Sequence, residues 1–177
     1  MVLIDMRKSK NLHSTALLFH LTIYAYQESY MKMVGSGSRA ILTHVIPYLT
    51  EMLKHLGMPE LSQKKSMDEN MSIYTSLVKE SGYIGDAVLN NDGDNSYIFE
   101  VRDCKLASEG HEIFKEGHIC PFAILAAAVI FYKTGAVLSI EDSEFNDSGS
   151  KTLITVRERT RLNRPIKNFS FQADSTN

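Results

Sequence analysis

Pro121-Phe-Ala-Ile-Leu-Ala-Ala-Ala-Val-Ile-Phe-Tyr-Lys-Thr-Gly135 is the most informative stretch of this chain. It is almost wholly apolar, and a helix with apolar side chains all round is stable only when it is buried. Proline is tolerated in the first turn of a helix, and glycine commonly follows the last turn. The stretch therefore predicts a central helix that the rest of the chain surrounds.

Three further helices are expected before this stretch. The first runs from about Asn11 to Met33 and is apolar nearly all round, which requires burial in the core or against a partner chain. The second begins after Ser38, a good N-cap residue, and ends at Gly57, and the third spans about Met67 to Ser81. The apolar residues of the first helix recur every three or four positions: Leu12, Ala16, Phe19, Ile23, Tyr26 and Tyr30.

Two segments of the chain carry hairpin signals. Residues 83–89 and 97–102 flank Asn-Asn-Asp-Gly-Asp-Asn, which is typical of a tight turn between strands. A short helix is expected over Cys104–Gly117. After the central helix, residues 136–141 and 152–157 are expected to pair as a second hairpin.

This order of elements predicts an α+β fold in which an antiparallel sheet of two hairpins packs against a helical layer. Strands that cluster as hairpins make a parallel sheet with alternating helices improbable. We expect a single domain over residues 1–160, with helix 11–33 as a candidate dimer interface. Residues 161–177 are expected to form a polar C-terminal tail.

Composition limits the class of protein. The 177 residues are 44% hydrophobic and 23% charged, with a formal net charge of -2, which excludes a disordered chain and argues against direct nucleic-acid binding. The most apolar N-terminal stretch, residues 16–26, is much shorter than the ~20 residues that cross a bilayer, so no membrane span is predicted. Two cysteines are too few for a disulfide scaffold, and we expect a cytoplasmic protein.

Both cysteines and two of the six histidines fall within residues 104–120. Thiolate sulfur and imidazole nitrogen are typical zinc ligands, so Cys104, His111, His118 and Cys120 are candidate ligands of a zinc ion. The helix that begins after Cys120 would favour its thiolate. The spacing is not a zinc-finger pattern, and the alternative interpretation is two buried cysteines with two surface or capping histidines.

Apolar and aromatic side chains are also sufficient to line a pocket. The first helix and the central helix offer more apolar surface than one thin sheet covers, which predicts a cavity for a small apolar ligand. Core packing explains the same residues without a ligand. The candidate ligand-binding residues are Phe122, Leu125, Phe131, Tyr26 and Tyr30.

Several features follow one another in a recognisable order: Phe99-Glu-Val-Arg-Asp-Cys104, Glu109-Gly-His111, Cys120-Pro121 at the start of an apolar helix, and Gly135 before a strand that ends in Glu141. This order resembles the 4-vinyl-reductase-like domain family, which includes archaeal hydrocarbon-binding proteins. The fold of that family is similar to the fold of TRAPP vesicle-tethering complex subunits. The resemblance covers roughly residues 35–156.

The resemblance implies a small-molecule sensing or carrying domain that is often dimeric and often holds a structural zinc near its pocket. Cys104 and Cys120 match cysteine positions of the family, with His111 as a further ligand. Family members often carry two more cysteines in the last hairpin, where this chain has Phe145 and Thr152 around Gly149. Either His111 or His118 therefore takes their place in binding zinc, or this chain has lost the site.

Three functions follow from these patterns. The leading hypothesis is a domain that binds an apolar or aromatic small molecule in a regulatory, sensing or carrier role. The first alternative is an assembly subunit that acts through a homodimer or a heteromeric complex. The second alternative is a metal-assisted reductase, although the chain has no nucleotide-binding fingerprint and no evident acid–base pair.

Overall fold

The computed structural model describes residues 2–35, 41–55, 61–93, 95–111 and 117–157. In this part of the chain three helices precede a β-hairpin, two helices follow it, and three strands complete the sheet. The helices are α1 (Val2–Val34), α2 (Leu42–His55), α3 (Met67–Glu80), α4 (Ala107–Gly110) and α5 (Pro121–Thr134), and the strands are β1 (Asp86–Asn91), β2 (Ser96–Arg102), β3 (Val137–Ile140), β4 (Glu144–Asn146) and β5 (Gly149–Arg157).

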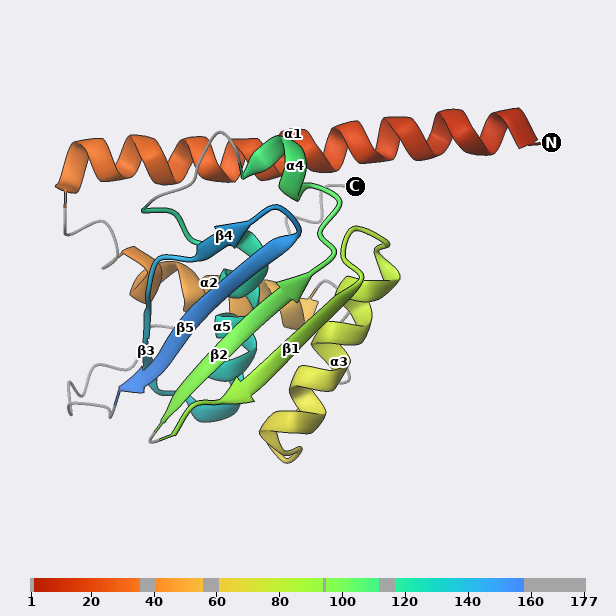
Figure 1. Cartoon of the computed structure of the whole chain (residues 1–177). Helices are drawn as coiled ribbons and strands as arrows, with labels where there is room; N and C mark the ends of the chain where they lie inside the picture. Colours follow the sequence, from red (N-terminus) through yellow and green to blue (C-terminus); the bar gives the residue numbers. More distant parts are fainter. Residues whose placement is uncertain (1, 36–40, 56–60, 94, 112–116, 158–177) are drawn as a thin grey trace, which may run out of the picture.

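The strands form one antiparallel sheet in the order β1-β2-β5-β3, with β4 also paired to β5. Side chains alternate along each strand, so Phe99 and Val101 of β2 are buried while Arg102 is exposed. The helices α2, α3 and α5 cover one face of this sheet (Figure 1). The predicted α+β class, with an antiparallel sheet packed against a helical layer, is therefore confirmed.

Helix α5 lies at the centre of the fold, as its sequence predicts. Its alanines 123 and 126–128 are completely buried, which lets the neighbouring helices approach its backbone closely. The Tyr74 hydroxyl of α3 donates to the Phe122 carbonyl at 2.7 Å, and the Thr50 hydroxyl of α2 donates to the Ala128 carbonyl at 3.0 Å. Gly135 follows the helix with φ of 62°, a conformation that glycine adopts at low cost.

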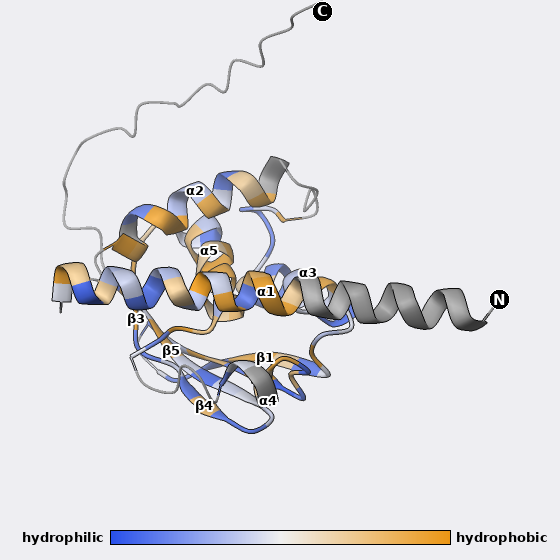
Figure 2. Cartoon of the chain, turned by 90° about the horizontal axis from the view of Figure 1, so that it is seen from above, coloured by the Kyte–Doolittle hydropathy of each residue, from blue (hydrophilic) through white to orange (hydrophobic). Residues whose placement is uncertain are grey.

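Helix α1 crosses one end of both layers and extends past the rest of the chain at its N-terminal end (Figures 1 and 2). It begins at Val2, nine residues earlier than the pattern predicted, and ends at Val34. The single chain buries this helix on one side only, so burial in the core, the first of the two predicted possibilities, accounts for part of its apolar surface. His20 and Tyr24 are buried against the body, whereas Phe19 and Tyr26 point into solvent.

Other boundaries differ from the sequence prediction. The first strand begins at Asp86 instead of Tyr83. Within the described part of Cys104–Gly117, which omits residues 112–116, the predicted helix forms over Ala107–Gly110. The proposed N-cap Ser38 and the tail 161–177 lie outside the described residues. Among the described helices, none combines the length and the apolar character that crossing a membrane requires.

Candidate functional site

The two cysteines are buried close to the start of β5. The Cys104 backbone N–H donates to the Ser148 carbonyl at 2.7 Å. The Cys120 side chain is hydrogen-bonded to the Ser150 side chain. Burial, with a smaller contribution from Cys120, raises the pKa of the Cys104 thiol to about 11. Burial also raises the pKa of Cys120. The fold thus brings both thiols to one place and keeps them protonated at neutral pH.

His111 ends α4 and faces the β4–β5 turn. Its Nδ1 lies 2.9 Å from the Asn146 carbonyl oxygen, so Nδ1 donates and Nε2 carries the lone pair. Its ring packs against Phe145 with centroids 4.6 Å apart. Burial lowers the pKa of His111, so the ring is neutral at pH 7. This fixed tautomer is the one a metal-binding histidine needs.

His118 points toward α1. Its Nε2 lies 3.3 Å from Oε2 of Glu28, and its ring centroid lies 5.7 Å from that of Tyr24. Glu28 also pairs with Lys32 at 2.8 Å, one turn later in the same helix. The side chain of His118 is 4% exposed, so it serves as a contact between α1 and the segment that leads into α5.

Gln27 attaches α1 to the same segment with two hydrogen bonds. Its side-chain nitrogen donates to the Ile119 carbonyl at 2.8 Å, and its side-chain oxygen accepts from the Ile119 N–H at 2.8 Å. Ile119 is buried, and it has no helix or sheet partner because it precedes α5. A single side chain therefore satisfies both backbone polar groups of a buried residue.

His20 and Tyr24 fill the space between α1, α4 and α5. The centroid of the His20 ring lies 5.0 Å from that of the Tyr24 ring and 5.7 Å from that of the Phe122 ring. Among the described groups, none forms a hydrogen bond with His20 Nε2. Burial, and then His111, lower the pKa of His20 to about 4. Burial and the two thiols raise the pKa of Tyr24. Tyr24 is thus a residue of α1 whose ionisation the two buried thiols oppose.

The four predicted zinc ligands therefore share one region without forming a closed metal site. No group of three or more His, Cys, Asp or Glu side chains in the described ranges is arranged to hold a metal ion. His118 contacts Glu28 through Nε2, whereas His111 contacts the Asn146 carbonyl through Nδ1. A zinc ion at the two cysteines would have to displace their protons and draw in at least one histidine.

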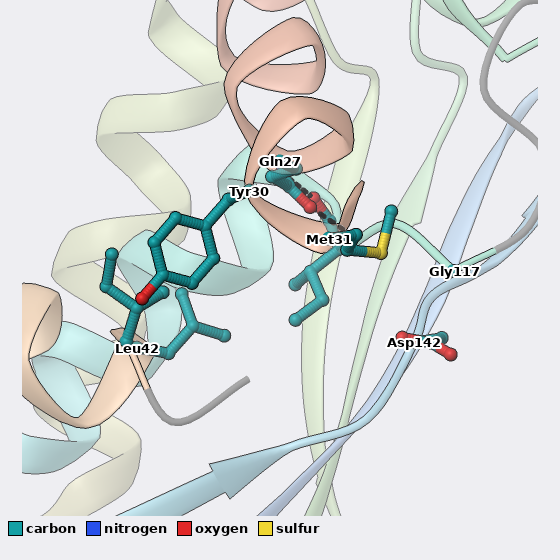
Figure 3. A pocket seen from close by; sticks show the side chains of 8 residues that line it. Gln27, Tyr30, Met31, Leu42, Gly117 and Asp142 are labelled. Carbon is teal, nitrogen blue, oxygen red and sulfur yellow. Dashed lines mark hydrogen bonds between the residues drawn. The ribbon is translucent and has the colours of Figure 1, made fainter. Parts of the chain in front are cut away.

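The five predicted ligand-binding residues do not gather around one cavity. Phe122, Leu125 and Phe131 are half-buried on α5 and pack against the core, while Tyr26 is 74% exposed on the outer side of α1. Tyr30 alone lines a small apolar pocket of about 50 Å³ between α1 and α2 (Figure 3). The other residues around this pocket are Gln27, Met31, Ile41, Leu42, Gly117, Ile119 and Asp142.

The sequence did not predict that these residues of α1 meet the segment of residues 104–120. His20, Tyr24, Gln27 and Glu28 are spaced four, three and one apart, so they form one face of the helix. His20 interrupts the apolar stretch of residues 16–26, and Gln27 and Glu28 follow that stretch directly, so these polar side chains are the signal that marks the face. It shows which side is special but not which segment it meets.

Comparisons with known proteins identify the fold of this chain but do not identify its family. No protein-family model matches the chain, and no curated protein matches its sequence. Among solved structures the chain is similar to a trafficking protein particle complex subunit 3 from Naegleria fowleri, covalently bound to palmitic acid. The TM-score is 0.53 and the identity 15%, over 82% of this chain and 97% of that one. This confirms the expected TRAPP-subunit-like fold.

Proposed function

We propose that this chain is an assembly subunit that pairs through α1 with a second copy of itself. The observation that carries this proposal is the outer stripe of α1, which we define as Phe19, Ile23, Tyr26 and Met33. These side chains are 68%, 39%, 74% and 75% exposed. Large apolar side chains gathered on one exposed helix face usually mark a protein interface.

The spacing of the outer stripe fits a helix as the partner. Its members, with half-buried Tyr30 between Tyr26 and Met33, are separated by four, three, four and three residues. This alternation is the seam of helices that pack with knobs in holes. The second copy of α1 has the same spacing, and a two-fold arrangement buries the same stripe on both chains.

The neighbouring structure supports an assembly role, because it is a subunit of a trafficking protein particle complex. At 15% identity the similarity extends to the fold, so the type of partner comes from the outer stripe and not from the comparison. A different subunit of a heteromeric complex is the alternative partner for the same surface.

Sedimentation velocity tests this proposal. We expect the full chain to be a dimer at micromolar concentration and the double variant Phe19→Glu/Tyr26→Glu to be a monomer, since a charge in a buried seam has no partner. The matched control is Leu77→Glu on α3, which places a charge on an apolar side chain that is 48% exposed but outside the stripe. The control should remain a dimer.

Two results would contradict self-pairing. A full chain that stays monomeric at tens of micromolar would leave the heteromeric partner as the surviving alternative. A Phe19→Glu/Tyr26→Glu variant that stays dimeric while its helical circular dichroism is unchanged would place the interface elsewhere.

Binding of a small apolar ligand is a second proposal, supported by the palmitic acid on the structural neighbour. The pocket beside Tyr30 holds about 50 Å³, room for a few water-sized groups only, so a long acyl chain needs α1 to shift from Gly117 and Ile119. Two further hypotheses would gain support from such a ligand. One is kinship to 4-vinyl-reductase-like domains, and the other is a metal-assisted reductase activity. A rise in Tm with palmitate, abolished by Tyr30→Ala, would support it.

A zinc ion at Cys104, Cys120 and a histidine is a third proposal. It is supported by the effect of Cys120 on the pKa of the Cys104 thiol and by the hydrogen bond from His111 Nδ1 to Asn146, which leaves Nε2 available as a ligand atom. We expect elemental analysis of the purified chain to give near one zinc per chain, lost in Cys104→Ala/Cys120→Ala. A folded chain without zinc would reduce both cysteines to core residues.

A further inference from the structure

The face of the sheet that points away from the helices contains a pocket of about 180 Å³. It lies over β2, β5 and the residues that join β3 to β4. Four of the seven side chains around it are carboxylates, and one is a cation. We call it the acidic pocket, and its residues are Asp92, Ile98, Glu141, Asp142, Glu144, Lys151 and Leu153.

The acidic pocket combines an apolar floor with a charged rim. Ile98 and Leu153 are paired neighbours on β2 and β5, and both are half-buried. Glu141 and Glu144 are exposed, and no lysine or arginine of the described ranges forms an ion pair with either. The pocket therefore suits an occupant that is both cationic and apolar.

The chain leaves the sheet beside this pocket. Strand β5 ends at Arg157, and the Val156 N–H donates to the Asn95 carbonyl at 2.8 Å. Asp92 is at the same end of the sheet, where its N–H donates to the Ser96 carbonyl at 2.9 Å. The residues after Arg157 thus begin next to the acidic rim.

The segment that follows has the matching composition. Residues 159–171 read Arg-Thr-Arg-Leu-Asn-Arg-Pro-Ile-Lys-Asn-Phe-Ser-Phe. They contain four cations and no acidic residue. Leucine, isoleucine and two phenylalanines lie between and after the cations, so the segment offers apolar side chains for the floor and positive charge for the rim.

We propose that residues 159–171 dock on the acidic pocket of their own chain. From Arg157 back to Lys151 the strand is six residues long, roughly 20 Å. Ten extended residues span roughly 33 Å, so the segment reaches the whole pocket with residues to spare. The arginines neutralise Glu141 and Glu144, and the apolar side chains cover Ile98 and Leu153.

A tryptophan at position 169 reports this docking, because the chain contains no tryptophan. In the full-length Phe169→Trp chain at low salt, we expect emission at the short wavelengths of a shielded indole. Raising the salt to 1 M reduces the Debye length to about 3 Å, so the emission should move to longer wavelength as the segment leaves the pocket.

Charge exchange makes the test specific. Glu141→Lys/Glu144→Lys in the reporter chain should give the long-wavelength emission at low salt, and adding Arg161→Glu/Arg164→Glu should restore the short-wavelength emission. The matched control is Glu80→Lys/Asp147→Lys, which changes the net charge equally at exposed positions outside the pocket. The control should retain the shielded emission.

None of these substitutions changes a residue of the outer stripe of α1. A negative result in this experiment is therefore distinct from a failure of the chain to dimerise.

Three results would overturn the proposal. Long-wavelength emission of the reporter at low salt means that the segment is undocked. Emission unaffected by Glu141→Lys/Glu144→Lys places the segment on another surface. A wavelength that depends on protein concentration places it on a second copy instead of its own chain.

Discussion

The Gln27 side chain satisfies both the N–H and the carbonyl of Ile119, a residue that is 5% exposed. In Gln27→Ala both groups remain buried without their partner, and we expect the free energy of unfolding to fall by about 2 kcal/mol. Urea denaturation measures this loss. Ser29→Ala, at an exposed position of the same helix, is the control and should change stability little. Equal stability of both variants would mean that α1 is not held through Ile119.

His20 makes the stability of the chain acid-sensitive. Its pKa is lowered from 6.5 to about 4 in the folded state, so between these values the unfolded state binds more protons. The contribution of His20 to the free energy of unfolding is therefore fully present above pH 6.5 and decreases as the pH falls. It levels off below about pH 4, after a loss of up to about 3 kcal/mol. His111, whose pKa is also lowered, acts in the same direction.

The variant His20→Leu isolates this contribution. Its free energy of unfolding should change less between pH 7 and pH 4 than that of the parent chain, while the smaller slope from His111 persists. Parallel curves for the two chains would show that His20 is not the residue that titrates.

For single residues, the sequence identified only part of the region where α1 meets residues 104–120. Cys104, His111, His118 and Cys120 were found because they lie within one short segment. The opposing residues of α1 were not, because a contact such as Gln27–Ile119 joins positions 92 apart in the chain. Periodicity shows which face a residue occupies, but it contains no information on which distant segment meets that face.

At the level of single elements, the β4–β5 hairpin depends on Gly149. A methyl group at this position would collide with the backbone carbonyl of Val101 on β2. Because backbone atoms cannot move aside as a side chain can, we expect Gly149→Ala to cost at least about 3 kcal/mol, measured as a lower Tm and a lower urea midpoint. Lys151→Ala, exposed on the same strand, is the control. A small effect at Gly149 would mean that β2 and β5 separate easily at this end.

The accuracy of the element predictions follows the locality of their signals. Helix α5 was predicted to within one residue, because its apolar run, Pro121 and Gly135 are all adjacent in sequence. Strand β4 was missed, since its three residues are defined only by pairing with β5. The helix over Cys104–Gly117 was predicted too long, and its described part ends at Gly110.

At the level of the whole molecule, self-pairing through α1 should make stability depend on protein concentration. We expect the Tm to rise as the chain is concentrated, because association favours the folded state by mass action. The monomeric Phe19→Glu/Tyr26→Glu variant should show a Tm that is independent of concentration. Calorimetry at two concentrations tenfold apart distinguishes these cases, and a constant Tm for both chains would argue against a dimer coupled to folding.

The sequence predicted the layers of the fold correctly. Its prediction that α1 is buried holds within the single chain for one side of the helix. An apolar helix was expected to be covered completely, and the single chain covers the His20–Tyr24 face but leaves Phe19 and Tyr26 exposed. Composition alone does not distinguish a helix buried in the core from one shared between two chains, as both are apolar nearly all round. The prediction left these two possibilities open, and the fold contains elements of both.

The distance along the chain between α1 and its attachment at Ile119 has a consequence for biosynthesis. Helix α1 leaves the ribosome before its attachment point, since Ile119 is made 92 residues after Gln27. At about 5–20 residues per second, α1 waits on the order of 5–20 s before its docking surface emerges. During this interval both of its apolar faces are accessible, so nascent chains of this protein should be bound by holding chaperones until translation has passed α5.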